Sequence, residues 1–577
     1  MNYLKKHEYL TATIIILVTT TIFLLPQLNN HATILSNDGF FHYSRFFDIY
    51  QQLQTGHFNA FQMNYTFDSS GRIINAFYGP VFAFFNALLL FICPNWLTYQ
   101  ILTNFIVFII GGLGLFRLLR YSGAKLGPSL SVIPLFLAIG SMPLWPNGTS
   151  FMGWSAALSP WILLLGIKMV KDKQEPINWL YLALGIGLVT QIHIISTVMF
   201  VLALIPFYII GFVLTSNRTS YLLNTLKAVL TTLFLSTNII YSLIIMKKNS
   251  IAFPSAGDLP ANAMKLGINN LRSNLLLFVL ILFLCQLIFA LIHFKSHSFN
   301  AYITIYATLW LLVSSKLFPW GYIQTLLPFL RTTFQAPYRF NVIVYPLFLL
   351  GIALSISYLI DSHHTCSIAE GIILSIVLSI ATITAGASFI KENVTAANYF
   401  KNSQQVITPG WGNYINPHRS KIRTSLIEND KGKVFTLIKA ASSDYLPCYN
   451  KNLSTVQIRQ LYLDNVINNE KGFTHIINSD GSLTLKWNAL KKEKKVIPIV
   501  MYPNSALKLN NKWLNISQIN HTAIGNPIIT SHKGINQVTL IFKHGRFYLI
   551  SLIITLISWV VSLITLFIKL TKKRRAL

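Results

Sequence analysis

Apolar runs long enough to cross a membrane as helices recur along this chain, and they constrain its fold more than any other feature. The first run covers residues 9–28, and no small-residue cleavage site follows it, so we expect an uncleaved first span. The other runs lie at 97–116, 127–143, 151–170, 178–194, 196–214, 227–246, 273–293, 300–317, 341–360, 368–388 and 547–569. The sequence therefore predicts a polytopic α-helical membrane protein with about 12 spans.

Basic residues beside these runs set the expected orientation. Arg117, Arg120 and Lys125 follow the second run, and the chain ends with the basic stretch 572–575. Because cytoplasmic loops are enriched in Lys and Arg, we expect a plasma-membrane protein with both termini in the cytoplasm. The short apolar run 80–92 fits this count as a re-entrant or interfacial segment on the outer side. The expected outer segments are 29–79, 247–272, 318–340 and 390–546.

Charge and composition exclude an ordinary cytosolic enzyme. The chain is 53% hydrophobic and only 11% charged, whereas soluble domains carry about 25% charged residues. Its net charge of +29 comes from basic residues in the loops, which favours anionic lipid or an anionic glycopolymer as partner over nucleic acid. The four cysteines are widely spaced and form neither a disulfide pattern nor a zinc motif.

The expected domains follow from the same patterns. Residues 1–389 form the multi-span membrane domain. Residues 390–546 contain alternating polar and apolar runs, such as 482–487 and 538–542, which predict an extracytoplasmic, mostly β domain. This segment holds 21 Lys and Arg but 8 acidic residues, so anionic surfaces should attract it. Residues 547–577 form the last span and a basic cytoplasmic tail.

One stretch of the first outer loop combines three chemically useful side chains. Asn37 or Asp38 can cap a helix, and Asp38, His42 and Arg45 would then share one face at positions i, i+4 and i+7. An acid, an imidazole and a guanidinium together suit proton abstraction beside an anionic leaving group, so these three are candidate catalytic residues. The alternative is a capped amphipathic helix whose charges face water, and the residues alone favour neither interpretation.

Carboxylates are scarce in the expected outer loops of the membrane domain. Only Asp38, Asp48, Asp68 and Asp258 occur there. A carboxylate that acts as a base in these loops must be one of the four. Asp38 has the best-placed partners, and Asp48, near the same helix face, is a secondary candidate.

A second candidate site comes directly before the run at 341–360. Arg339 offers a two-pronged guanidinium to a lipid-linked phosphate, with Gln335 and Tyr338 as hydrogen-bonding neighbours and Arg331 as a secondary candidate. Alternatively, Arg339 reaches toward lipid headgroups, as arginines at helix ends do.

Two further residues carry weaker signals. His193 lies near the outer end of its run, where a hydrogen-bonded helix-end histidine is the simpler interpretation and a catalytic role the alternative. Lys248, with Lys247, falls on the outer side against the orientation rule. A tolerated exception is the simpler explanation, and a phosphate contact is the functional one.

The residues from Asp38 to Arg45, together with Tyr78-Gly79-Pro80, resemble the first outer loop of GT-C type polytopic membrane glycosyltransferases. The motif from Gln335 to Phe340 is similar to one in a bacterial membrane family named 6-pyruvoyl-tetrahydropterin-synthase-related. The β segment followed by a final span also resembles that family. No zinc–histidine set supports pterin chemistry, so the resemblance implies the family's layout and no pterin reaction.

The GT-C resemblance implies that a sugar is transferred from a polyprenyl-phosphate donor to an acceptor on the outer face. The acceptor would be a cell-envelope glycopolymer, glycolipid or protein. Asp38 would be the base or would orient the acceptor, and Arg339 would contact the donor phosphate. Many GT-C loops carry two adjacent acids, but Asn37 precedes Asp38 here, so we assign no metal ligands and leave a divalent cation open.

Two other functions compete with glycosyl transfer. A transporter or flippase for lipid-linked saccharides would place charges near the middle of the bilayer, whereas the charged residues of this chain gather at the loop ends. A non-catalytic envelope protein whose β domain binds glycan would tolerate the loss of Asp38.

Overall fold

The computed structural model describes residues 2–248, 251–252, 256–267, 274–361, 365–402, 419–450 and 452–575. The chain forms two compact units, each built from segments that are distant in sequence. Unit 1 comprises Met1–Ser36, Gln100–Leu233 and Ala256–Ser403. Unit 2 comprises Asn37–Tyr99, Phe234–Ser255 and Gln404–Leu577.

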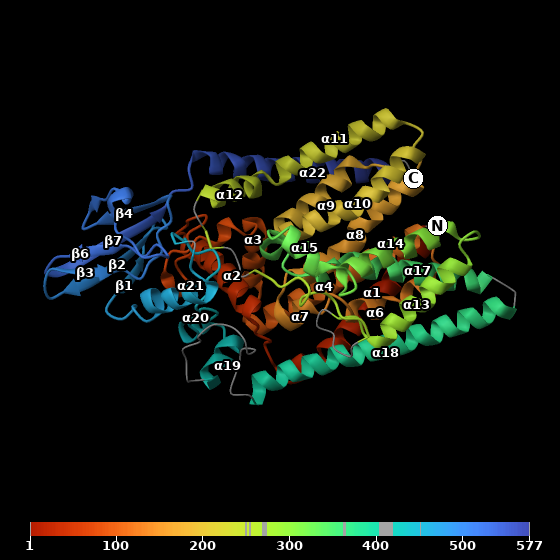
Figure 1. Ribbon diagram of the computed structural model, residues 1–577, viewed down its shortest axis with the longest axis horizontal. Coiled ribbons are helices and arrows are strands. Elements are labelled where there is room, and N and C mark those ends of the chain that lie inside the picture. Colours follow the sequence, from red (N-terminus) through yellow and green to blue (C-terminus); the bar gives the residue numbers. More distant parts are fainter. Residues whose placement is uncertain are drawn as a thin grey trace. The chain divides into compact units, whose positions relative to one another are not determined.

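Unit 1 is helical. Its helices are α1 (Asn2–Asn29), α5 (Leu126–Ser131), α6 (Ile133–Ala138), α7 (Leu144–Gly148), α8 (Met152–Lys171), α9 (Trp179–Ile192), α10 (Ile194–Leu214), α13 (Leu277–Ile292), α14 (Ser298–Ser314), α15 (Trp320–Leu326), α16 (Leu330–Thr333), η3 (Pro337–Phe340), α17 (Asn341–Asp361) and α18 (Thr365–Asn402). Helices α4 (Trp96–Ser122) and α11 (Arg218–Leu235) lie mostly in this unit. The longest is α18, which runs unbroken for 38 residues (Figure 1).

The described residues contain seven helices long and apolar enough to cross a membrane. A further pair, α11 with α12 (Thr237–Lys248), passes the same test together but is bent by 58°. Four of the predicted runs correspond to shorter apolar helices, so the structure supports a multi-pass membrane protein but does not confirm 12 spans. The run at 80–92, expected to be re-entrant or interfacial, is the short helix α3 (Pro80–Ile92).

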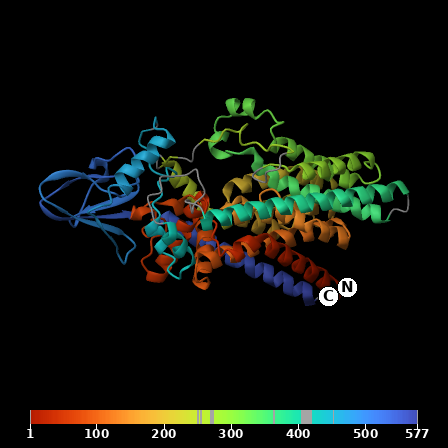
Figure 2. The same ribbon diagram turned by 90° about the horizontal axis from the view of Figure 1, so that it is seen from below.

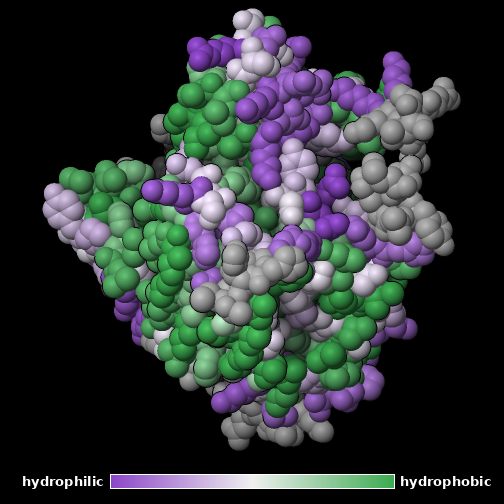
Figure 3. Space-filling model, turned by 90° about the vertical axis from the view of Figure 1, so that its right-hand side faces the viewer, coloured by the Kyte–Doolittle hydropathy of each residue, from purple (hydrophilic) through white to green (hydrophobic). Residues whose placement is uncertain are grey.

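The surfaces of the long helices carry apolar side chains that a soluble protein would bury. On α18, Ile376 and Ile383 are 54% and 70% exposed, and on α10 Val213 is 63% exposed. Hydrophobic residues likewise cover large parts of the face shown in Figure 3. Such exposure is stable where lipid tails surround the helices.

Polar side chains inside unit 1 join three of its helices. Gln286 on α13 donates to Asn300 on α14 over 3.2 Å, Asn300 donates to Ser355 on α17 over 2.8 Å, and Ser355 donates back to Gln286 over 2.8 Å. Gly351 leaves the space they need, because a Cβ there would lie 2.8 Å from the Gln286 amide nitrogen. Such hydrogen bonds hold apolar helices in register.

Unit 2 combines helices with the β structure. Its helical elements are α2 (Asn37–Thr55), η1 (Phe67–Ser69), η2 (Ile74–Ala76), α3, α12, α19 (Arg419–Ile427), α20 (Lys433–Leu437), α21 (Thr455–Tyr462), η4 (Leu463–Ile467), η5 (Ile516–Gln518) and α22 (Arg546–Arg575). Its strands are β1 (Thr474–Ile477), β2 (Leu483–Ala489), β3 (Glu493–Val496), β4 (Ser505–Leu509), β5 (Lys512–Trp513), β6 (Ile528–Ser531) and β7 (Gly534–Phe542).

The strands form two antiparallel sheets, seen from two directions in Figures 1 and 2. One has five strands in the order β1-β2-β7-β4-β5, and the other pairs β3 with β6. Alternation along β2 turns Leu485 and Trp487 inward and Lys486 outward, as the sequence pattern predicts. The Trp487 indole donates to the Ser531 hydroxyl over 3.0 Å, which ties β2 to β6.

The expected domain boundaries differ from the observed units. The boundary at 389/390 falls inside α18, because the helix continues to Asn402. The segment predicted to be mostly β begins with helices α19 to α21, and its first strand starts at Thr474. Most of the loop 29–79 belongs to unit 2 with the sheets, not to the helical unit that precedes it in sequence.

Candidate active site

Helix α2 of unit 2 carries the three candidate catalytic residues. It begins at Asn37, and its first turn contains Asp38, where the partial positive charge of the helix end favours a carboxylate. The helix ends at Thr55, and Gly56 follows with a positive φ of 75°, which suits a residue without a Cβ. The carboxylate of Asp38 is exposed.

His42 and Arg45 lie one and two turns farther along α2 and are buried, at 5% and 0% exposure. Arg45 Nη1 is 3.2 Å from His42 Nδ1, and because a guanidinium only donates, Nδ1 must accept. Arg45 Nε also donates to the Asn75 side chain over 3.0 Å. The alternative that all three charged side chains face water is therefore wrong for His42 and Arg45, because the rest of unit 2 packs over them.

Two tyrosines complete this group. The Arg45 guanidinium lies 4.5 Å from the centre of the Tyr78 ring, and the Tyr445 hydroxyl donates to the Tyr78 hydroxyl over 3.3 Å. Burial raises the pKa of Tyr78, and the charge of Asp38 adds to the increase while Arg45 opposes it. Asp38 and Arg45 thus both act electrostatically on Tyr78. We name Asp38, His42, Arg45, Tyr78 and Tyr445 the α2 cluster.

Tyr445 is held in an unusual backbone conformation. Its φ is 62°, a left-handed value that non-glycine residues rarely adopt. The Tyr445 amide donates to the Ala252 carbonyl over 2.8 Å, and the Tyr445 carbonyl accepts from the Tyr502 hydroxyl over 3.0 Å. Such strain persists only where the surroundings fix it, and it gathers at functional sites.

The electrostatics of the α2 cluster suit a stable positive charge. Burial lowers the pKa of Arg45 to about 10, which still leaves the guanidinium protonated at neutral pH. His42 accepts a hydrogen bond at Nδ1, so its neutral form carries its proton on Nε2. The cluster therefore combines an exposed carboxylate, a neutral imidazole and a buried cation.

Asp48, the secondary candidate on α2, is buried and committed to the fold. Its carboxylate accepts hydrogen bonds from the Gln52 side chain over 2.7 Å and from the amides of Tyr65 and Thr66 over 2.8 and 3.2 Å. Burial raises the pKa of Asp48 to about 6, against the effect of these hydrogen bonds. Asp48 thus fastens the loop after α2 to the helix, and we assign it a structural role.

Asp68 has a comparable environment. It lies 3.6 Å from the Lys439 ammonium and accepts a hydrogen bond from the Tyr462 hydroxyl over 3.2 Å. Burial raises the pKa of Asp68 to about 6. Of the four carboxylates expected in the outer loops, only Asp38 and Asp258 are exposed.

The second predicted group lies in unit 1 and is centred on Arg339, in η3. Arg339 Nη1 donates to the Phe334 carbonyl over 3.0 Å, and Nη2 donates to the Gln335 side chain over 3.1 Å. The predicted contact between Arg339 and Gln335 is present, whereas the Tyr338 side chain has no hydrogen bond to either among the described residues. The Nε of Arg339 is buried and has no hydrogen-bond partner among the described residues.

The segment before Arg339 is pinned to the loop at 256–267. Gln335 has a φ of 61°, and Gly257 packs so closely that a Cβ there would lie 2.1 Å from the Gln335 carbonyl oxygen. Arg331 is exposed and donates from Nε to the Gly257 carbonyl over 3.2 Å, so its guanidinium supports the loop.

The remaining predicted residues separate into two cases. His193 contacts the Ser196 hydroxyl over 2.7 Å, as a hydrogen-bonded helix-end histidine would. His193 and Arg339 interact electrostatically, so both belong to one region of unit 1. Lys248 ends α12, and its side chain lies outside the described residues.

Sequence reasoning named Tyr78 only within a motif and missed Tyr445. The two tyrosines are 367 positions apart, so no local pattern could pair them. No group of three or more His, Cys, Asp or Glu that could hold a metal ion occurs in the described part of the chain.

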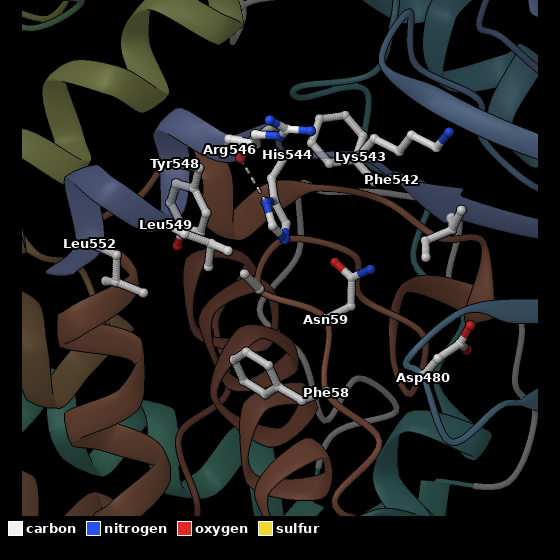
Figure 4. A pocket seen from close by; sticks show the side chains of 13 residues that line it. Phe58, Asn59, Asp480, Phe542, Lys543, His544, Arg546, Tyr548, Leu549 and Leu552 are labelled. Carbon is white, nitrogen blue, oxygen red and sulfur yellow. Dashed lines mark hydrogen bonds between the residues drawn. The ribbon is translucent and has the colours of Figure 1, made fainter.

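Unit 2 also contains a pocket of about 430 Å³ at the start of α22, shown in Figure 4. Phe58, Tyr548 and Leu552 give it apolar walls, and Asn59 and Asp480 add polar groups. A space of this size fits a small molecule or part of a chain.

The sequence matches no protein-family model and no curated protein. Among solved structures, the chain resembles the cryo-EM structure of the arabinosyltransferase EmbB from Mycobacterium smegmatis, with a TM-score of 0.37 and 8% sequence identity. The alignment covers 93% of this chain but 63% of EmbB, less than two thirds of that protein. A TM-score this low supports no argument about fold or activity.

Proposed function

We propose that the protein is a membrane glycosyltransferase that moves a sugar from a polyprenyl-phosphate donor to a cell-envelope acceptor on the outer face of the plasma membrane. One observation carries this proposal. Asp38 is an exposed carboxylate at the start of α2, and the next turns of the same helix carry a buried neutral imidazole and a buried cation. Asp48 and Asp68, in the same unit, are held inside the fold.

In the proposed reaction an acceptor hydroxyl attacks the anomeric carbon of the donor sugar. Asp38 takes the hydroxyl proton as the new C–O bond forms, and the lipid phosphate leaves with the electron pair of the broken bond. Arg45 supplies a buried positive charge on the same helix as Asp38. His42 acts as a positioning residue, because it contacts Arg45.

We assign the donor phosphate to Arg339, with Gln335 and Tyr338 beside it in the chain. Lys248, in unit 2, stays a separate candidate for a phosphate contact. The Arg339 side chain is partly exposed, and a phosphate oxygen would accept a hydrogen bond from its guanidinium. His193 lies close enough to Arg339 to belong to this region. A divalent cation is a separate expectation, and transfer measured with and without a chelator tests it.

The central experiment assays purified protein in lipid nanodiscs with a panel of radiolabelled polyprenyl-phosphate sugars. Loss of a general base typically slows a reaction 10²–10⁴-fold, so Asp38→Asn should reduce transfer by about that factor. Asp258→Asn removes the other exposed carboxylate and is the matched control, with wild-type transfer expected. If Asp38→Asn transfers sugar at the wild-type rate, glycan binding without catalysis or saccharide transport replaces this proposal.

The outer-face mechanism also requires a particular topology. Single cysteines introduced near residues 60, 260, 330 and 450 should react with a membrane-impermeant reagent from outside, and cysteines near 122 and 172 should not. Labelling of position 450 only from the cytoplasm would end the proposed mechanism.

A further inference from the structure

The outward face of the five-stranded sheet is hollowed into a groove of about 470 Å³. We name it the sheet groove. The lining residues that carry the argument are Thr484, Lys486, Lys508, Trp513, Gln537 and Thr539. All belong to unit 2, and none belongs to the α2 cluster.

The strand register explains the hollow. Thr484 on β2 pairs with Thr539 on β7, Thr539 pairs with Lys508 on β4, and Lys508 pairs with Trp513 on β5. These residues form a row across the sheet, with short side chains in the middle and long ones toward the edge. The Thr484 and Thr539 hydroxyls are 2.7 Å apart, so the floor is polar and close to the backbone.

The aromatic side chain of Trp513 lines one edge of the groove. Trp513 lies on the edge strand β5 and is 61% exposed. The other side chains on this face are mainly polar, so Trp513 is its one large aromatic group among the lining residues. The ammonium groups of Lys508 and Lys543 lie 5.8 and 5.5 Å from the centre of a Trp513 ring. Exposure of the tryptophan ring to water is unfavourable, and the free energy falls when the flat face of a sugar ring covers it.

The charges of the sheet groove favour an anion. Lys486 and Lys508 line it, and Lys543 reaches Trp513 from beside it. The one carboxylate among the lining residues is Asp480, which accepts hydrogen bonds from the Ser482 amide and hydroxyl over 3.0 and 2.6 Å. Those bonds lower the pKa of Asp480 and occupy one of its oxygens.

Amide groups supply the remaining recognition chemistry. Gln537 donates to the Asn511 side chain over 3.3 Å, so two amides meet on the rim. Amides and threonine hydroxyls donate and accept at once, which matches the hydroxyl groups of a saccharide. The pocket in Figure 4 shares Asp480 and Ile541 with the sheet groove, so the two hollows adjoin.

We propose that the sheet groove binds an anionic oligosaccharide. Trp513 stacks on one sugar ring, Lys486 and Lys508 meet the acidic substituents, and Thr484, Thr539 and Gln537 hydrogen-bond to hydroxyls. This binding site does not depend on the transfer reaction and exists whether or not Asp38 is catalytic.

Binding of two fluorescent hexasaccharides to the full chain in zwitterionic nanodiscs tests the proposal. One probe is a hexamer of galacturonic acid and the other a neutral hexamer of glucose, with affinities measured by anisotropy. The acidic hexamer should bind at least about tenfold more tightly than the neutral one. Trp513→Ala and the double change Lys486→Gln with Lys508→Gln should each weaken its binding about tenfold. Trp513→Tyr should restore most of the loss, because it keeps an aromatic face.

Two variants in the same domain serve as controls. Leu490→Ala removes a side chain that is 86% exposed outside the groove, and Lys494→Gln removes an exposed charge on β3. Both should bind the acidic hexamer as the wild type does. Wild-type affinity in Trp513→Ala, equal binding of both hexamers, or no binding of either would each overturn the proposal. Equally tight binding of a linear polyphosphate would overturn sugar recognition in favour of charge alone.

Discussion

Arg45 in unit 2 and Arg339 in unit 1 carry the same guanidinium group in opposite surroundings. Arg45 is fully buried and, besides His42 on its own helix, it contacts Asn75 and the Tyr78 ring, about thirty residues away. Arg339 is partly exposed, and its hydrogen bonds go to Phe334 and Gln335 just before it.

The difference indicates a structural role for Arg45 and a ligand-binding role for Arg339. A buried arginine that joins distant segments is part of the structure, and its charge acts on neighbours at a distance. A partly exposed arginine supported by its own segment keeps part of its side chain open to a ligand, as Arg339 does. Substitution of Arg45 should therefore lower stability, whereas substitution of Arg339 should weaken donor binding.

The largest effect is expected at Arg45. Arg45→Ala removes the hydrogen bond to Asn75 and leaves a cavity beneath Tyr78, so unfolding free energy should fall by about 2–4 kcal/mol. Thermal unfolding in detergent, followed by tryptophan fluorescence, measures this loss. Arg339→Ala is the matched comparison and should change stability by less than about 1 kcal/mol. Equal losses at both positions would mean that the two arginines do not differ as described.

A smaller effect, on the donor, is expected at Arg339. A charge-assisted hydrogen bond is worth about 1.5–3 kcal/mol, so Arg339→Ala should raise the donor KM about ten- to hundredfold. Arg339→Lys should recover only part of this loss, because Lys lacks the planar fork.

Arg331→Ala is the control for that experiment, since Arg331 lies in the same segment but points to a backbone carbonyl. Its donor KM should stay close to the wild-type value. Full recovery of the donor KM in Arg339→Lys would show that a positive charge alone is enough.

The smallest effect concerns pH and reports on unit 2. Asp48 and Asp68 each have a pKa raised to about 6 by burial, so the folded state holds protons that the unfolded state releases near pH 4. Stability is therefore greatest below the unfolded pKa and is lost as pH rises through 6. Between pH 5 and 7 the loss is about 1 kcal/mol for each carboxyl.

Unfolding temperatures measured across this pH range test that slope. Asp48→Asn removes one of the two titrating groups and should flatten the curve, whereas Asp258→Asn, at an exposed position, should leave it unchanged. A wild-type protein that becomes more stable between pH 5 and 7 would contradict the assignment of Asp48 and Asp68.

The sequence could predict what depends on neighbours along the chain. Most of the apolar runs are single helices, whereas the run 127–143 is divided between α5 and α6 and the run 227–246 between α11 and α12. Alternation identified strands β2 and β7. These features arise from periodicity and local hydrogen bonding, which the order of residues encodes directly. Contacts between Arg339 and Gln335 could be anticipated for the same reason.

The burial of Arg45 and the partnership of Tyr78 with Tyr445 could not be predicted. Helix periodicity shows which residues share a face, but it does not show what packs against that face. In unit 2 the packing partners come from residues more than three hundred positions away. Helix α18 continues past residue 389 to Asn402, and helices α19 to α21 precede the first strand.

Helix α18 has a consequence for how the chain leaves the membrane. Its 38 residues extend about 57 Å at 1.5 Å per residue, whereas the hydrocarbon layer is about 30 Å thick. Much of the helix must therefore stand outside the lipid as a stiff spacer whose rotation and length are coupled. Deleting seven residues from that outer part would shorten it by about 10 Å and turn its end by only about 20°. Deleting five would turn the end by about 140°, so the length of this helix sets the rotation of its C-terminal end about the helix axis.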